Sequence, residues 1–379
     1  MSTDSEHLNI AFVFDGKYAV ADGVPNYMRT LGDYFEDCGH DVSFVVGESA
    51  VQDSRVYDIG RVATVPSNGN QVSFAIPSSG RDIKDALTEI QPDILHVQMP
   101  YNPFLGARLI KAANQETAIV GTFHILPNSK WIDLGTRALG LMLRPTLKRF
   151  DQIVSVSEPA KQFCESTFKV ESAVLPCPVD INKFQKGNRL PEYDDGKTNI
   201  VFMGRLVERK GCQHLIAALS QLDSHNLADI RVLIAGKGDM GPELVKQVEI
   251  AGLTDIVKFL GFVAEDDKPD LLASADIAVF PATGGESFGI VLTEAMAAGA
   301  GVVVGGNNPG YSSVLKDTPE VIVDPKLTNS SASLLSSLIE SKQMRQDLHT
   351  RQQETVQQYD ISVVGQEWLQ IYKQALSKK

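Results

Sequence analysis

The sequence predicts an α/β protein of two domains, each built around a parallel sheet. Short apolar runs typical of buried strands alternate with amphipathic segments typical of helices, and the alternation starts again after a proline-containing connector at residues 172–180. With 379 residues, of which 43% are hydrophobic and 22% charged, the chain is long enough for two domains that each bury a core.

The first domain is expected to begin with a strand at residues 8–14, followed by a loop at residues 15–23. A helix comes next, because apolar side chains recur there every three or four residues and so line one helix face. These side chains are Val24, Met28, Leu31, Phe35 and Cys38, and Gly39 ends the helix.

The rest of the first domain follows from composition and apolar runs. Residues 49–80 are rich in Ser, Gly, Asn and Pro, which favours a small strand pair with surface loops. Residues 81–90 predict a helix of mixed charge. Further strands of the first sheet are expected at residues 41–46, 93–97, 118–123 and 152–157.

The second domain repeats the strand and helix pattern. The Ala-rich run that starts at Glu294 predicts a helix, and residues 359–379 predict C-terminal helices. The strands of the second sheet are expected at residues 199–203, 230–235, 256–260, 276–280 and 301–304.

Charge and composition exclude several classes of function. The formal net charge of −12 argues against nucleic acid as a partner. No apolar run has the length of a membrane-spanning helix, and Met1 to His7 lack the pattern of a signal sequence, so we expect a cytoplasmic protein. The four cysteines have no metal-ligand spacing and no Asp-x-Asp motif occurs, so we expect neither a metal nor another cofactor.

A strand, a loop and the start of a helix follow each other around residues 276–298, and this arrangement predicts a ligand site. The backbone amides of Phe288, Gly289 and Ile290 would lack intrahelical acceptors and suit a phosphate or a polarised sugar oxygen. Glu286 in the loop and Glu294, expected two turns inside the helix, would bind hydroxyls at two ends of an elongated ligand. The alternative is that Glu286 caps the helix and Glu294 is solvated.

A basic loop follows the strand at residues 199–203. Arg205 and Lys210 project from it, and a guanidinium fork with a mobile ammonium suits a diphosphate. The alternative is a loop that only balances charge on an acidic protein.

Together these motifs resemble the donor site of retaining glycosyltransferases of family 4, which have the GT-B fold. The resemblance rests on Glu286 to Glu294 with Phe288-Gly289 between them, and on Gly204-Arg205 with Lys210-Gly211 upstream. Their order is most similar to that in phosphatidylinositol mannosyltransferases. The resemblance implies that Arg205 and Lys210 stabilise the leaving diphosphate and that Glu286 binds the transferred sugar.

The resemblance also implies an arrangement of domains. Two Rossmann-like domains would face each other across a cleft, residues 1–180 on the acceptor side and residues 181–358 binding the nucleotide sugar. A C-terminal helix at residues 359–379 would return to the first domain. The loop 261–263 resembles the family segment that packs around the nucleotide base.

Five positions of the first domain enter the predicted site. His124 ends the Thr122-Phe123-His124 motif and would lie near the transferred sugar, although a lone histidine at a strand end is more often structural. Gly23 is expected to let the donor diphosphate approach, or else to be an ordinary turn glycine. Asp22, which replaces a usual glycine, and Asn128 with Lys130 are expected to contact the acceptor. His96 is expected to be a packing or acceptor-side residue.

Residues 135–150 interleave Arg137, Arg144, Lys148 and Arg149 with large apolar side chains and contain no acid. Such a helix suits the surface of an anionic bilayer, which would place the protein peripherally on the inner face of the cell membrane. It equally suits a helix packed on the core with its basic side facing the donor cleft. The expected basic cluster at residues 81–90 is reduced to Arg81 and Lys84 among three acids.

Three functions are therefore considered. The first is a metal-independent, retaining transfer of a hexose, with GDP-mannose favoured as donor, to a lipid such as phosphatidylinositol. The second is transfer from a UDP-sugar to a soluble or polysaccharide acceptor. The third is a sugar-nucleotide epimerase or a noncatalytic nucleotide-sugar binder. No pattern predicts the oligomeric state.

Overall fold

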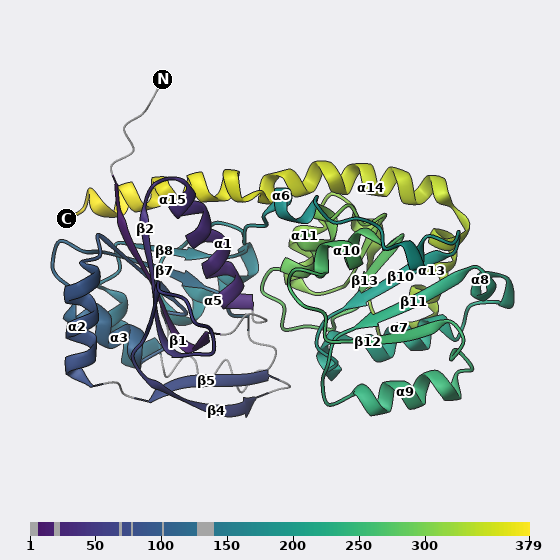
Figure 1. Cartoon of the computed structure of the whole chain (residues 1–379), viewed down its shortest axis with the longest axis horizontal. Coiled ribbons are helices and arrows are strands. Elements are labelled where there is room, and N and C mark those ends of the chain that lie inside the picture. The colour runs from purple at the N-terminus through teal and green to yellow at the C-terminus, as the bar shows by residue number, and fades with distance from the viewer. Residues whose placement is uncertain (1–6, 19–22, 68–69, 77–78, 101, 127–139) are drawn as a thin grey trace, which may run out of the picture. The chain divides into compact units, whose positions relative to one another are not determined.

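The computed structural model describes residues 7–18, 23–67, 70–76, 79–100, 102–126 and 140–379. Two compact units are present, a first unit of Met1–Pro178 with Ile361–Lys379 and a second unit of Val179–Asp360. Each unit contains a parallel sheet with helices packed on it (Figure 1).

The first unit is built on a seven-stranded parallel sheet with the strand order β3-β2-β1-β6-β7-β8-β9. Its central strands are almost wholly buried, as expected for apolar strands covered on both faces. The strands are β1 (Asn9–Tyr18), β2 (Asp41–Ser49), β3 (Val56–Asp58), β6 (Ile94–Gln98), β7 (Ala118–Phe123), β8 (Gln152–Ser155) and β9 (Ala173–Val174).

The first strand is longer than predicted. β1 continues to Tyr18 through an irregularity between Phe14 and Lys17, where a loop was expected. Asp15 turns inward there, and its Oδ1 accepts the backbone N–H of Gly106 at 3.0 Å. The polar residues of this stretch hid the strand because the sequence shows no apolar alternation in it.

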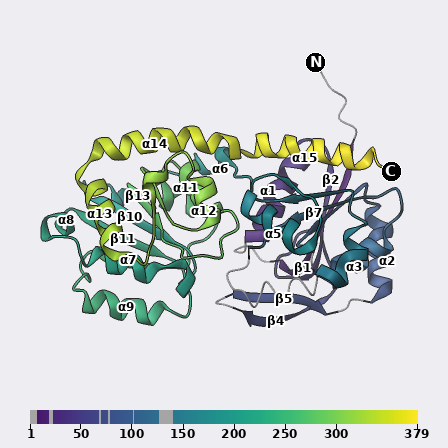
Figure 2. The same ribbon diagram turned by 180° about the vertical axis from the view of Figure 1, so that it is seen from behind.

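The helices that cover this sheet include α1 (Gly23–Asp37), α2 (Gly80–Ile90), α3 (Leu105–Ala112), α5 (Glu158–Phe168) and α15 (Ile361–Leu376). The C-terminal α15, yellow in Figures 1 and 2, contacts α1 and β7. Its side chains Trp368 and Tyr372 are wholly buried, so the C-terminal segment is part of the first unit's core. The resemblance had implied this return of the chain.

Two smaller features complete the first unit. β4 (Arg61–Ser67) and β5 (Asn70–Ile76) form the antiparallel pair expected within residues 49–80. Residues 140–147 are helical, and Leu143 and Leu147 are buried beside Phe123 and Phe168. Residues 135–139 of the predicted basic helix lie outside the described residues.

The second unit is built on a six-stranded parallel sheet of order β12-β11-β10-β13-β14-β15. The strands are β10 (Thr198–Met203), β11 (Ile230–Ala235), β12 (Val257–Gly261), β13 (Ile277–Phe280), β14 (Val303–Gly306) and β15 (Ile322–Val323). The helices are α6 (Ile181–Phe184), α7 (Cys212–Leu219), α8 (Ser224–Ala228), α9 (Gly241–Ile250), α10 (Lys268–Ala273), α11 (Ile290–Ala297), α12 (Pro309–Val314), α13 (Thr328–Glu340) and α14 (Lys342–Val356).

The predicted order of strand, loop and helix is present at β13 and α11, with one correction. α11 begins at Ile290, so Glu294 lies about one turn inside the helix rather than two. No helix in the described part of the chain is both long and apolar enough to cross a bilayer.

Candidate active site

The carboxyl ends of β10 and β13 carry the predicted donor residues of the second unit. The two strands are neighbours in the sheet, so the loops that follow them meet at one edge. Backbone contacts fix the loops together, since Thr283 N donates to Arg209 O at 2.9 Å. Gly211 has a φ of 76°, and a Cβ there would lie 1.9 Å from the carbonyl oxygen of Pro281. Only glycine permits this close approach.

Three charged side chains, which we call the Glu286 cluster, meet where these loops join. Lys210 Nζ lies 2.9 Å from Glu286 Oε1, and Arg209 Nη1 donates to the same oxygen. The carboxylate side chain is 13% exposed. Burial raises the pKa of Glu286, but Lys210 and Arg209 together lower it by more than burial raises it. The pKa of Glu286 therefore lies below its ordinary value. Glu286 is therefore an ionised acceptor held in place by two cations.

The start of α11 lies beside this cluster. Gly289 is the N-cap residue with a φ of 134°, and Tyr311 packs against it so closely that a Cβ would lie 2.8 Å from the tyrosine ring. Gly310 also approaches the backbone of Glu286, where a Cβ would lie 2.3 Å from its carbonyl oxygen. Phe288 is buried and meets the ring of Tyr359 edge-on at 5.4 Å. Tight packing thus fixes the direction of the first amides of α11.

Glu294 belongs to a second group of charges, the Glu294 cluster. Lys268 Nζ lies 3.7 Å from Glu294 Oε1 and 2.8 Å from Glu265 Oε1. Burial raises the pKa of Glu294 more than Lys268 lowers it, so the pKa lies above the ordinary value. The unliganded protein therefore holds Glu294 in an environment that disfavours its charge, which is the reverse of the situation at Glu286.

Two exposed side chains follow strands of the same sheet, at the edge where the strands end. Arg205 follows β10 and is exposed. Phe262 follows β12, at the same edge of the sheet, and is 55% exposed. A large aromatic side chain left in solvent at this edge is available to stack on a planar ligand.

His124 follows β7 in the first unit. Its Nε2 lies 2.7 Å from Gln98 Oε1, and the ring of Tyr27 meets it edge-on at 4.8 Å. Burial lowers the pKa of His124 to about 3, so the imidazole is neutral. The structure therefore places a neutral imidazole at the carboxyl edge of the first sheet.

The remaining predicted residues of the first unit have different outcomes. Gly23 is the first residue of α1, and among the described residues beyond its chain neighbours and its own helix no atom lies within 4 Å of a Cβ built on it. Asp22, Asn128 and Lys130 lie outside the described residues. His96 is a packing residue, wholly buried, with Nδ1 2.7 Å from Tyr372 Oη and Nε2 2.7 Å from Thr122 Oγ1.

Sequence reasoning missed three polar side chains that pair, through charge or a hydrogen bond, with Glu286, Glu294 and His124. Arg209 directly precedes Lys210 in the basic loop, so its adjacency was an available signal. Lys268 lies 26 residues before Glu294 and carries no motif that points to it. Gln98 ends the strand next to that of His124, and strand order is needed to connect them. Among the described residues no group of three or more His, Cys, Asp or Glu side chains is arranged for a metal ion.

Comparison with known proteins agrees with this fold. The family model "Glycosyltransferase Family 4" matches residues 21–183, and the model "Glycosyl transferases group 1" matches residues 185–355. The match boundary lies close to the division between the two units.

Several relatives match over nearly their full length, among them the following two. The chain is 31% identical to a phosphatidyl-myo-inositol mannosyltransferase of Mycolicibacterium smegmatis, covering 97% of this chain and 94% of the relative. It is 30% identical to a protein of the same name from Mycobacterium tuberculosis, covering 97% of each. Among solved structures, a sucrose-phosphate synthase from Thermosynechococcus elongatus superposes with a TM-score of 0.75 at 17% identity, covering 98% of this chain and 99% of that one. The chain therefore belongs to glycosyltransferase family 4 and has the GT-B fold.

Proposed function

We propose that the protein is a retaining glycosyltransferase that moves a hexose from a nucleotide diphosphate sugar, with GDP-mannose favoured, to a lipid such as phosphatidylinositol. The observation that carries the proposal is the Glu286 cluster beside the N-terminus of α11. Cations, an ionised carboxylate and unpaired helix amides lie together there, as binding of a sugar diphosphate requires. The choice of sugar and acceptor is supported by two phosphatidyl-myo-inositol mannosyltransferases, which are 31% and 30% identical to this chain over 97% of its length.

The diphosphate would bind to Arg205, Lys210 and the first amides of α11. Departure of the nucleotide diphosphate develops negative charge on the β-phosphate, and fixed positive groups stabilise that charge most in the transition state. Cationic side chains would thus take the part that a divalent metal plays elsewhere, in line with a sequence that has no Asp-x-Asp motif.

The hydroxyl groups of the donor would bind to the two glutamates. Glu286, held ionised by its two cations, would accept hydrogen bonds from the transferred sugar. Glu294 would accept from the ribose, and its interaction with ribose hydroxyls would offset the cost of keeping a buried carboxylate charged. The exposed ring of Phe262 would stack on the base.

Retention of configuration would follow from attack on the same face from which the phosphate leaves. The sequence motifs point to no dedicated base for that face, so the departing phosphate oxygen would accept the proton of the acceptor hydroxyl. His124, as a neutral imidazole, would contact the transferred sugar or the acceptor without contributing a positive charge. Asp22, Asn128 and Lys130 remain proposed acceptor contacts.

The acceptor side of the proposal rests on a basic apolar patch, defined as Leu141, Met142, Arg144, Lys148 and Arg149. Leu141 and Met142 are 62% and 60% exposed although they are large and apolar. The three basic side chains beside them are exposed as well. Apolar side chains that reach the acyl boundary and cations that reach anionic headgroups are the features of a peripheral membrane helix. The buried Leu143 and Leu147 would hold this helix on the core.

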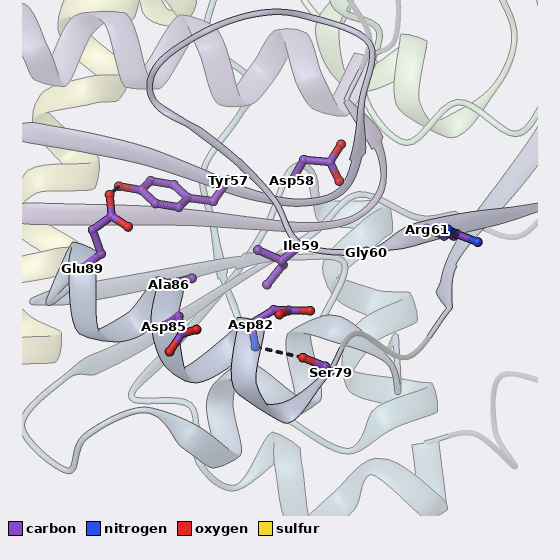
Figure 3. A pocket seen from close by; sticks show the side chains of 10 residues that line it. All are labelled: Tyr57, Asp58, Ile59, Gly60, Arg61, Ser79, Asp82, Asp85, Ala86 and Glu89. Atoms are coloured by element: carbon purple, nitrogen blue, oxygen red, sulfur yellow. Dashed lines mark hydrogen bonds between the residues drawn. The ribbon is translucent and has the colours of Figure 1, made fainter.

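The second candidate function is transfer from a UDP-sugar to a soluble or polysaccharide acceptor, and one observation bears on its acceptor. An open groove of about 590 Å³ lies between α2 and the segment after β3, and Figure 3 shows its rim of acidic side chains Asp58, Asp82, Asp85 and Glu89. Glu89 accepts a hydrogen bond from Tyr57 Oη at 3.1 Å. A surface of this charge repels anionic lipid. The groove therefore favours a soluble or polysaccharide acceptor, which is the acceptor of this second candidate.

The deciding experiment is mass spectrometry of the products. Purified protein is incubated with GDP-mannose or UDP-glucose and with phosphatidylinositol vesicles or a total lipid extract. A lipid that gains one hexose from GDP-mannose supports the proposal. Donor hydrolysis without any lipid product removes the lipid acceptor and leaves the second candidate, and conversion of the donor to an epimer would end the transferase proposal. Addition of EDTA is expected to leave the rate unchanged.

Vesicle binding tests the basic apolar patch directly. The triple variant Arg144→Ser, Lys148→Ser, Arg149→Ser is expected to lose sedimentation with anionic vesicles while donor affinity stays the same. The matched control is Arg81→Ser, Lys84→Ser, Lys111→Ser, which removes the same charge from other exposed positions of the first unit. Equal binding of both triple variants would end the assignment of membrane contact to this patch.

A further inference from the structure

The neighbouring strands β6 and β7 carry two polar pairs on one face of the first sheet. Side chains alternate along a strand, so His96 and Gln98 share a face, as do Thr122 and His124. His96 Nε2 lies 2.7 Å from Thr122 Oγ1, and two residues further along, His124 Nε2 lies 2.7 Å from Gln98 Oε1. The row of polar groups thus runs from the core, at Tyr372, to the carboxyl edge where His124 lies.

The contact with Gln98 decides which ring nitrogen of His124 carries the proton. An amide oxygen only accepts hydrogen bonds, so His124 Nε2 must donate to Gln98 Oε1. Because the ring is neutral, Nδ1 then has no proton and keeps its lone pair. No described residue forms a hydrogen bond with Nδ1.

Stability of the fold does not by itself account for a glutamine at position 98. Its side chain is wholly buried, and its Nε2 has no hydrogen-bond partner in the described part of the chain. A buried amide donor without a partner destabilises a fold, and an apolar side chain of similar size avoids that cost. The other side of the same amide is the acceptor for His124. We therefore expect the functional reason for a buried glutamine at position 98 to be its hydrogen bond with His124.

We propose that Gln98 is a positioning residue that holds His124 as the Nε2–H tautomer, so that Nδ1 accepts a hydrogen bond from a hydroxyl of the sugar or of the acceptor. The role of His124 at the reacting groups rests on the proposed function. The role of Gln98 as the residue that sets its tautomer does not, since it follows from the contact between the two side chains.

The tautomer is measured directly by ¹⁵N NMR of the full chain labelled at histidine, with the signal of His124 assigned through its loss in His124→Asn. The wild type is expected to carry the proton on Nε2. In Gln98→Leu the acceptor is gone, so protonation at Nδ1 becomes populated, while thermal stability is unchanged or higher. Gln98→Glu keeps an acceptor oxygen and is expected to keep the Nε2–H form. A wild-type proton on Nδ1, or an unchanged tautomer in Gln98→Leu, would overturn the proposal.

Kinetics give a second readout once a product is known. Gln98→Leu is expected to lower kcat by roughly tenfold, the upper range for one neutral hydrogen bond, with KM for the donor unchanged. Gln98→Glu should restore kcat at a pH where His124 is neutral. The matched control Gln352→Leu removes an equally buried amide that bonds the backbone of Val303 in the second unit, and it should leave the tautomer of His124 as it is. If no donor is turned over, the proposed function fails while the NMR result still decides the role of Gln98.

Discussion

The two glutamates of the donor segment are expected to respond differently to the same isosteric change. Glu286→Gln removes a charge that Lys210 and Arg209 stabilise, whereas Glu294→Gln removes a charge that its surroundings disfavour. Both variants should lose donor turnover, because both carboxylates are proposed to bind donor hydroxyls. Only Glu286→Gln should destabilise the unliganded protein.

The direction of the pH dependence follows from linkage. The pKa of Glu286 in the folded protein is below its ordinary value of 4.5, so its stabilising effect is complete above that value and is lost as pH falls through the folded pKa. The pKa of Glu294 is above 4.5, so its ionised form costs stability at neutral pH, and the cost disappears as pH falls through the folded pKa.

The size of the effect follows from the contacts. Lys210 Nζ lies 2.9 Å from Glu286 Oε1 and Arg209 donates to the same atom. A glutamine still accepts hydrogen bonds there but without charge assistance, so the loss is about 2 kcal/mol. For a unit the size of Val179–Asp360 this lowers Tm by roughly 4–8 °C. For Glu294→Gln we expect Tm to stay the same or to rise.

Thermal unfolding followed by circular dichroism, at several values from about pH 7 down to about pH 2, tests this because the series then passes below the ordinary pKa of a glutamate. The difference between wild type and Glu286→Gln should be largest at neutral pH and should shrink in acid, where the wild-type carboxylate becomes protonated. Equal losses for the two variants at neutral pH would refute the reasoning, as would a loss for Glu286→Gln that persists unchanged in acid.

Three further predictions concern packing. Gly23→Ala should leave Tm unchanged, because the described residues outside its own helix place no atom within 4 Å of the added Cβ. The variant should still reduce donor turnover if the diphosphate approaches there, and unchanged turnover would remove Gly23 from the site. Gly289→Ala places a Cβ 2.8 Å from the ring of Tyr311 at a φ of 134°, so urea unfolding should show a loss of about 1–3 kcal/mol, and an unchanged midpoint would contradict the packing. Tyr372→Phe leaves Nδ1 of the buried His96 without its 2.7 Å partner and should lower the free energy of unfolding by about 1–3 kcal/mol in the same assay. The control Tyr57→Phe removes a hydroxyl bonded to the exposed Glu89 and should lower it less.

Much of the fold follows from local sequence pattern. Apolar runs predicted the central strands β7 and β10 to within one residue, because parallel strands buried on both faces are mostly apolar. The helical spacing that begins near Gly23 likewise located α1. β1 was predicted too short, since Asp15 and Lys17 are polar and the strand continues through them.

The sequence also predicted the strand, loop and helix that carry the proposed donor segment, because the pattern of that segment is local. Glycine at 289, glutamates at 286 and 294, and a following apolar helix lie within one short stretch. Charged residues and glycines at fixed offsets were therefore sufficient to predict an anion site at the start of a helix, and their resemblance to a known family supplied the reaction.

Only the tertiary structure decided which side chains meet. Glu286 pairs with Arg209 across 77 residues, and His124 pairs with Gln98 across 26. These contacts depend on β13 lying beside β10 and on β7 lying beside β6, and strand order is a property of the whole sheet that no local period encodes. Burial depends on it too, so the opposite pKa shifts of Glu286 and Glu294 follow from the packed fold, although the two residues are of the same type and eight positions apart.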